Sequence, residues 1–93
     1  MSVIGTPMIV DGEPVIVRAG RSKQRIAAWA DDWDGRSLTL LVSADKEHWT
    51  HVESIGWITD TTIIDELVGS LYYRLRSETG DLQGVGASIA EVD

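Results

Sequence analysis

Cysteine is absent from this sequence of 93 residues, and proline and histidine each occur only twice. Without cysteine the chain forms neither disulfides nor thiolate metal sites, so its stability must come from packing, strand pairing or assembly. The lack of disulfides suits folding in a reducing cytosol. No apolar run approaches the roughly 20 residues of a membrane-spanning helix, and no basic region precedes an apolar stretch of signal-peptide length. We therefore expect neither a membrane segment nor export by a signal peptide.

Positive charge is also scarce. Eight Lys and Arg residues stand against fifteen Asp and Glu residues, which gives a net charge of −7. Such a surface repels a phosphate backbone, so we expect no nucleic-acid partner. An acidic surface favours solubility and could also complement a basic surface on another protein. With 43% hydrophobic and 25% charged residues, the composition is that of an ordinary folded domain with one modest core.

Alternating apolar residues between turn signals predict short β-strands along most of the chain. Segment 23–30 contains several alanines and has a helical alternative, but it is short and lies between two turn clusters, which favours a strand. No segment has a strong helical period. About seven strands so arranged predict an all-β fold, namely an antiparallel immunoglobulin-like β-sandwich. The predicted strands are residues 14–19, 23–30, 38–42, 49–55, 61–67, 71–76 and 85–92.

The first 13 residues differ from the rest because Gly5 and Pro7 interrupt an apolar segment. Proline removes a donor from a strand ladder, so we expect an N-terminal arm or edge strand here, with the sandwich in residues 14–93. In an assembly the arm would bury its side chains against a neighbour. Two tryptophans in predicted loops either cap the core or protrude as binding anchors. The predicted partner-binding residues are therefore Val3, Ile4, Met8, Ile9, Val10, Trp33 and Trp57.

The chain from about Pro14 to its end resembles fibronectin type III and related immunoglobulin-like modules. Leu67 precedes Tyr73 by six residues, as in the tyrosine corner of that family, although Gly69 stands where the family usually has proline. The resemblance implies that Tyr73 is the corner tyrosine and that Trp29 is the core tryptophan of the second strand. Together with the alternation of apolar residues, it predicts a core that contains Trp29, Leu38, Leu40, Val42, Leu67, Tyr73, Leu75 and Ile89.

The segment from Gly35 to Trp49 resembles small structural proteins of tailed bacteriophages. In those proteins a glycine and an apolar strand precede the pattern Ser-x-Asp-Gly-x-x-Trp, and a strand with Tyr-Arg follows. Here Ser43, Asp45 and Trp49 match the pattern, and Lys46 replaces the glycine. Such proteins decorate or cement the capsid, or build fibres and tails. The turn also resembles the Asp-box of sialidase-type propellers, but it occurs once here, which favours a simple hairpin turn.

Residues with catalytic or metal-binding chemistry are few. His48 and His51 are three apart on a predicted strand and so point to opposite faces, which disfavours a shared metal. Asp31, Asp32 and Asp34 share a loop but lack the spacing of a calcium-binding loop, so a solvated turn is favoured. Gly80, Gly84 and Gly86 are not followed by the lysine and helix of a phosphate-binding loop, so we expect turn and bulge glycines here. We expect no enzymatic activity, no metal and no cofactor.

These observations lead to one main hypothesis and two alternatives. The main hypothesis is a non-enzymatic virion structural protein, made in the host cytoplasm, that decorates or cements a phage capsid. Its partners would be the major capsid protein or other virion subunits, and it could also form a homo-oligomer. The first alternative is a carbohydrate- or cell-surface-binding module that uses Trp33 and Trp57. The second is a tail or baseplate subunit.

Overall fold

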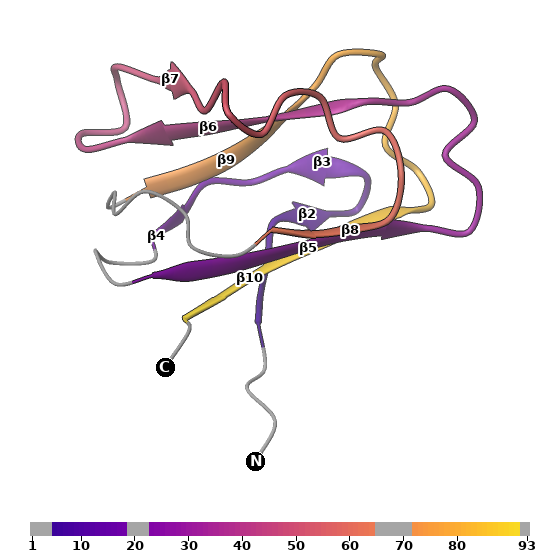
Figure 1. The fold of residues 1–93 in the computed structure, drawn as a ribbon, viewed down its shortest axis with the longest axis horizontal. Helices are drawn as coiled ribbons and strands as arrows, with labels where there is room; N and C mark the ends of the chain where they lie inside the picture. The colour runs from indigo at the N-terminus through magenta and orange to yellow at the C-terminus, as the bar shows by residue number, and fades with distance from the viewer. Residues whose placement is uncertain (1–4, 19–22, 65–71, 92–93) are drawn as a thin grey trace.

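The computed structural model describes residues 5–18, 23–64 and 72–91, and this part of the chain contains β-strands but no helix (Figure 1). The predicted all-β class is therefore confirmed. The described residues form ten strands rather than about seven, because the N-terminal segment adds two and predicted strand 14–19 is divided into two. The strands are β1 (Thr6–Pro7), β2 (Ile9–Val10), β3 (Glu13–Pro14), β4 (Val17–Arg18), β5 (Gln24–Ala30), β6 (Leu38–Ser43), β7 (Thr50–His51), β8 (Thr62–Ile64), β9 (Tyr72–Ser77) and β10 (Val85–Glu91).

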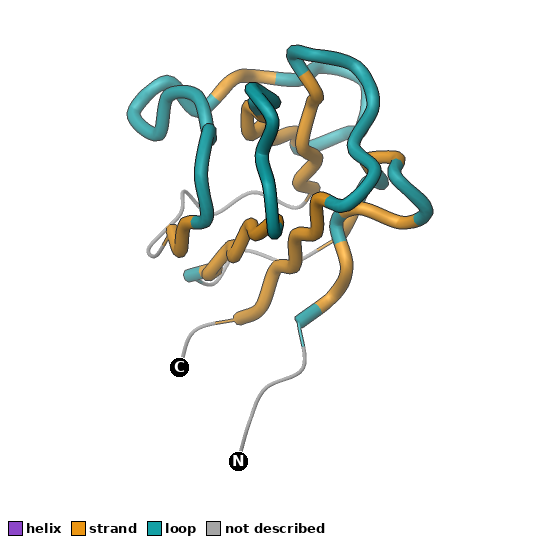
Figure 2. The backbone as a smooth tube through the Cα atoms, turned by 90° about the vertical axis from the view of Figure 1, so that its right-hand side faces the viewer, coloured by secondary structure: helices purple, strands orange, loops and turns teal. Residues whose placement is uncertain are grey.

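The strands form two four-stranded sheets and one small hairpin, and all pairs are antiparallel. The first sheet has the order β1-β10-β5-β8, and the second has the order β4-β9-β6-β7. The two sheets face each other as two layers (Figures 1 and 2). The hairpin of β2 and β3 bridges them, since β2 lies against β10 and β3 lies against β9.

The core lies between the two layers and follows the alternation of the strands. In β10, Val85, Ala87 and Ile89 point inward, and in β5 the inward residues include Ile26 and Ala28. Most of the predicted core is confirmed: Leu38, Leu40, Tyr73, Leu75 and Ile89 are buried, and Val42 packs at the margin. Leu67 lies outside the described residues.

The prediction that Trp29 belongs to the core is wrong. Its side chain is 47% exposed, whereas the adjacent Ala28 is 1% exposed. Alternation places Trp29 on the outer face of β5 with Arg25 and Ala27, because successive side chains of a strand point to opposite faces. On that face the indole packs on Gly86, its cross-strand partner in β10.

Part of the predicted N-terminal arm belongs to the fold. Thr6 and Pro7 form β1 at the edge of the first sheet, paired with Ile89 and Ser88 of β10. Met8 follows, and its side chain is fully buried in the core. Its N–H donates to the carbonyl of Ala87 at 2.9 Å, so strand pairing holds this segment against the sheet. Met8 is therefore a core residue and not a partner-binding residue in this structure.

Candidate partner-binding surface

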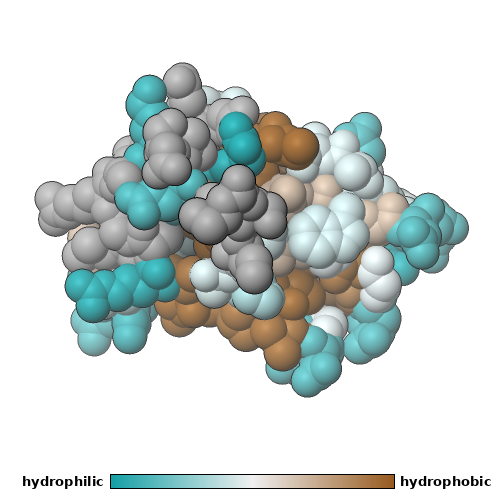
Figure 3. Space-filling view, turned by 90° about the horizontal axis from the view of Figure 1, so that it is seen from below, coloured by the Kyte–Doolittle hydropathy of each residue, from teal (hydrophilic) through white to brown (hydrophobic). Residues whose placement is uncertain are grey.

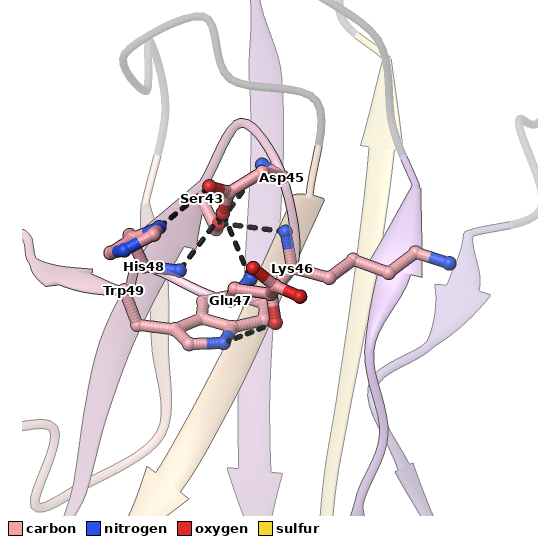
Figure 4. Close-up of polar contacts among 6 residues, drawn as sticks. All are labelled: Ser43, Asp45, Lys46, Glu47, His48 and Trp49. Atoms are coloured by element: carbon pink, nitrogen blue, oxygen red, sulfur yellow. Dashed lines mark hydrogen bonds and ion pairs between the residues drawn. The ribbon is translucent and has the colours of Figure 1, made fainter.

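The hairpin turn between β6 and β7 is held by side-chain hydrogen bonds to its own backbone (Figure 4). The hydroxyl of Ser43 accepts the N–H groups of Asp45 at 3.2 Å and Lys46 at 2.9 Å. The carboxylate of Asp45 then accepts the N–H groups of Glu47 at 2.8 Å and His48 at 2.9 Å. These bonds explain why the turn needs Ser and Asp at these two positions, since both side chains can bond the backbone within a tight turn.

The carboxylate of Asp45 is also bound by the ring of His48, with 2.7 Å between Oδ2 and Nδ1. The hydrogen bond from the backbone of His48 is the main reason that the pKa of Asp45 lies far below its ordinary value, and the His48 ring, the Glu47 backbone and Ser43 add to it. Asp45, Glu47 and His48 bring possible metal ligands within 4.8 Å of one another on the surface. Asp45 and His48 already bind each other there, so a cation would have to displace these bonds.

The turn is also packed onto the outer face of the second sheet. The Lys46 ammonium lies 5.0 Å from the ring centre of Tyr72, and the Arg74 guanidinium lies 4.5 Å from that of Trp49. Both are cation–π distances. The indole Nε1 of Trp49 donates to the Lys46 carbonyl at 3.0 Å, which fixes the ring. A hollow of about 250 Å³ beside this contact is lined by Ile16, Arg18, Lys46 and Tyr72.

A larger hollow lies beside β8, at the edge of the first sheet. Trp57 is 62% exposed and Ile63 is 69% exposed, and both line this hollow of about 380 Å³. Its polar lining includes Asp60 and Thr62. Burying large apolar side chains is the dominant favourable term in protein association, so two such residues at one hollow mark a candidate contact surface. The full lining is Ser54, Ile55, Trp57, Ile58, Thr59, Asp60, Thr62, Ile63 and Ile64.

The apolar surface continues from this hollow onto the outer face of the first sheet. Ile63 stands opposite Ala27 in the pairing of β8 with β5. Trp29 lies two residues further along the same face of β5. Figure 3 views the molecule from the side of β5 and β10, where brown hydrophobic side chains lie among near-white and teal ones. We call Ala27, Trp29, Trp57 and Ile63 the β8 apolar surface.

Carboxylates lie next to the β8 apolar surface. The indole Nε1 of Trp33 donates to the Thr61 hydroxyl at 3.3 Å, which ties the loop after β5 to the residues before β8. That loop carries Asp31, Asp32 and Asp34, and Asp60 lies next to Thr61 in the chain. The Asp32 carboxylate accepts the N–H of Asp34 at 2.9 Å, so one of these acids shapes the loop.

The seven predicted partner-binding residues differ in their exposure to solvent. Trp57 and Val10 are exposed, at 62% and 47%, while Ile9 and Trp33 are half-buried against the core. Trp33 therefore behaves as the core-capping alternative describes. Val3 and Ile4 lie outside the described residues. Sequence reasoning missed Ile63, although it stands between Thr62 and Ile64 in a short strand where alternation leaves one apolar residue facing outward.

Comparison with known protein families, with characterised proteins and with solved structures gives no match. Within the part of the chain that the structure describes, no helix is long and apolar enough to cross a membrane.

Proposed function

We propose that this protein is a non-enzymatic structural protein of a tailed-phage virion, and that it decorates or cements the capsid. The proposal is supported by the resemblance of the segment from Gly35 to Trp49 to such proteins. The observation that carries the binding role is the pair Trp57 and Ile63, which are exposed at 62% and 69% beside one hollow. Exposed large apolar groups that gather at one place are typical of surfaces that bind other proteins.

We further propose that the two sheets form an immunoglobulin-like sandwich. Two facing antiparallel sheets with a common core support this assignment. Tyr73 is fully buried in β9, as a corner tyrosine would be. The outer position of Trp29 departs from the family pattern, because an immunoglobulin-like module usually has a tryptophan in its core.

In the proposed role, one small domain bridges neighbouring capsid subunits. Each contact can be weak, because symmetric repetition over the capsid multiplies the number of contacts and raises the overall avidity. The major capsid protein is the expected partner, with other virion subunits or further copies of this chain as additional contacts. A tail or baseplate position would use the same kind of surface on a different partner.

The test first asks whether a major capsid gene lies beside the gene for this chain, and then measures binding to shells assembled from that capsid protein. We expect saturable co-sedimentation with the shells and, in purified virions, detection of this chain by mass spectrometry. Electron microscopy of labelled virions distinguishes capsid from tail and baseplate. Failure to bind shells together with absence from purified virions would exclude the virion role.

A carbohydrate- or cell-surface-binding role is the second candidate. It is favoured by one observation: the exposed indole of Trp57 lines a hollow that also contains Asp60 and the hydroxyls of Ser54, Thr59 and Thr62. An aromatic face with nearby hydrogen-bonding groups suits a sugar ring. A glycan array probed with the wild type and Trp57→Ala would show a sugar signal that the substitution abolishes.

A further inference from the structure

We propose that β8 and the β8 apolar surface bind an extended, basic segment of a partner protein, which adds to the first sheet as a further strand. This inference depends on the proposed function in one respect: the partner is taken to be a virion subunit. It goes beyond that function because it names the surface, the conformation of the bound segment and its charge.

β8 lies at the edge of the first sheet, where another strand can be added. Within residues 5–18, 23–64 and 72–91, the only strand that pairs with β8 is β5. An edge strand offers main-chain donors and acceptors to another chain, and strand addition is a common way to bind extended segments. The side chains of Thr62, Ile63 and Ile64 line the hollow beside this edge.

The β8 apolar surface would contact the apolar side chains of the bound segment. An extended segment directs every second side chain to the same face, about 7 Å apart. On a strand added beside β8, one such side chain can pack on Ile63, and another two positions along can reach Trp57 at the same hollow. Ala27 and Trp29 lie one strand further in, on β5, and extend the apolar surface beyond Ile63. The bound segment should therefore carry apolar residues at alternate positions.

The carboxylates beside β8 favour a basic segment over a second copy of this chain or a sugar. Asp60 lines the hollow, and the hydrogen bond from Trp33 to Thr61 holds the acidic loop of residues 31–34 at the same edge. Lysine or arginine in the bound segment would complement these carboxylates. A second copy is disfavoured because each chain carries a net charge of −7 and brings the same acidic edge. A neutral sugar could donate hydroxyl hydrogen bonds to these carboxylates, but it would leave their negative charge uncompensated.

The first experiment measures binding to capsid shells by three variants. Trp57→Ala combined with Ile63→Thr should weaken binding by at least about tenfold, as loss of central apolar anchors does. Asp60→Asn should weaken it by about threefold and reduce its salt dependence, because it removes a charge and keeps the apolar contacts. Ile16→Thr is the matched control, since Ile16 is 44% exposed and lines the other hollow, and it should bind like the wild type.

If the double variant binds shells as tightly as the wild type, the assignment to β8 is wrong and the virion role stands. If the wild type neither binds shells nor occurs in purified virions, the virion role fails, and a second experiment decides the inference alone. It titrates the wild type with two synthetic peptides, an alternating Lys-Val heptamer and an alternating Glu-Val heptamer, and follows amide and indole resonances by NMR.

The Lys-Val peptide should shift the resonances of β8 and of the Trp57 indole, with at least about tenfold higher affinity than the Glu-Val peptide. Equal affinity for both peptides, or shifts confined to the outer face of the second sheet, would overturn the inference. A concentration-dependent dimer that the double variant abolishes would assign the edge to a second copy instead, and a sugar signal without peptide binding would assign it to a glycan.

Discussion

The indole of Trp29 covers Gly86, its cross-strand partner in the pairing of β5 with β10. A Cβ atom added at Gly86 would lie 2.5 Å from both Cε2 and Nε1 of the indole, which is closer than such atoms approach. Glycine at this position therefore lets a large ring lie flat on the sheet. An aromatic residue beside a glycine in a neighbouring strand covers backbone that the glycine leaves bare.

A valine at position 86 should displace the Trp29 ring and expose the sheet beneath it. We expect Gly86→Val to lower the free energy of unfolding by about 1–2 kcal/mol through lost ring contact, although valine itself favours strands. The control is Ala90→Val on the same face of β10, which should have a smaller effect. Urea unfolding gives the free energies, and the indole N–H resonance of Trp29 reports the displacement. An unmoved resonance in Gly86→Val would contradict the contact.

Met8 is the residue for which the structure changes the expected effect of a mutation most. Its side chain is 0% exposed and belongs to the core cluster. Met8→Ala should therefore cost about 2–5 kcal/mol by lost transfer free energy and cavity formation. Val10→Ala, at a position that is 47% exposed, should cost less than about 1 kcal/mol. Equal small losses in urea unfolding of both variants would show that the segment before residue 10 is dispensable for stability.

How far the sequence predicts this fold depends on which pattern is read. Alternation in β10 and β6 placed Ile89, Leu38 and Leu40 inside, and the structure agrees, because period 2 follows directly from strand geometry. Alternation in β5 also placed Trp29 with Arg25, on what proved to be the outer face. The family resemblance led to the opposite interpretation, and the strand geometry decided the outcome.

The binding surface was less predictable for a physical reason. Trp57 could be named as a candidate because a tryptophan in a connecting segment either caps the core or protrudes. Alternation leaves Ile63 facing outward, but the sequence does not show that β8 is an edge strand beside a hollow, because edge position is a property of sheet order. The burial of Met8 depends in the same way on the pairing of β1 with β10. Pro7 predicted an arm or an edge strand, but that prediction does not say which residue of the segment faces the core.

Acid should weaken the fold through Asp45 and Glu78. Hydrogen bonds from the backbone and ring of His48 lower the pKa of Asp45, and those from Thr39 and Arg76 lower the pKa of Glu78. A folded-state pKa below the unfolded value means that the stabilisation is present above about pH 4 and is lost as pH falls through the folded pKa values. The urea midpoint should therefore decrease steadily below pH 4.

Substitution separates the contribution of Asp45 from general acid unfolding. Asp45→Asn should be less stable than the wild type at pH 7 and should lose less stability on acidification, because the group whose protonation is linked to unfolding is gone. Glu53→Gln, which removes a carboxylate from an exposed turn, is the control and should leave the midpoint at each pH nearly unchanged. If Asp45→Asn and the wild type show the same loss between pH 7 and pH 3, the turn does not contribute to acid sensitivity.

Lys46 adopts a backbone conformation that suits glycine, the residue found there in the phage proteins that the turn resembles. Its φ is 70°, a left-handed value, and among the described residues the other non-glycine positions with positive φ are both aspartates, Asp11 and Asp34. A residue with a Cβ atom loses about 1 kcal/mol in this conformation relative to glycine, whereas Asp tolerates it better. The Lys46 ammonium over the ring of Tyr72 returns about 0.5–1 kcal/mol, as exposed cation–π contacts do.

These two opposing effects can be measured separately at this one position. Lys46→Ala removes the cation–π contact and keeps the Cβ atom, so it should be destabilised by about 0.5–1 kcal/mol. Lys46→Gly removes both and should unfold at a free energy close to that of the wild type, about 1 kcal/mol above Lys46→Ala. Tyr72→Leu in each background checks that the stabilisation lost in Lys46→Ala comes from the contact with the Tyr72 ring. Equal stability of the Gly and Ala variants in urea would show that the turn holds residue 46 without strain, and that its lysine offers only its charge.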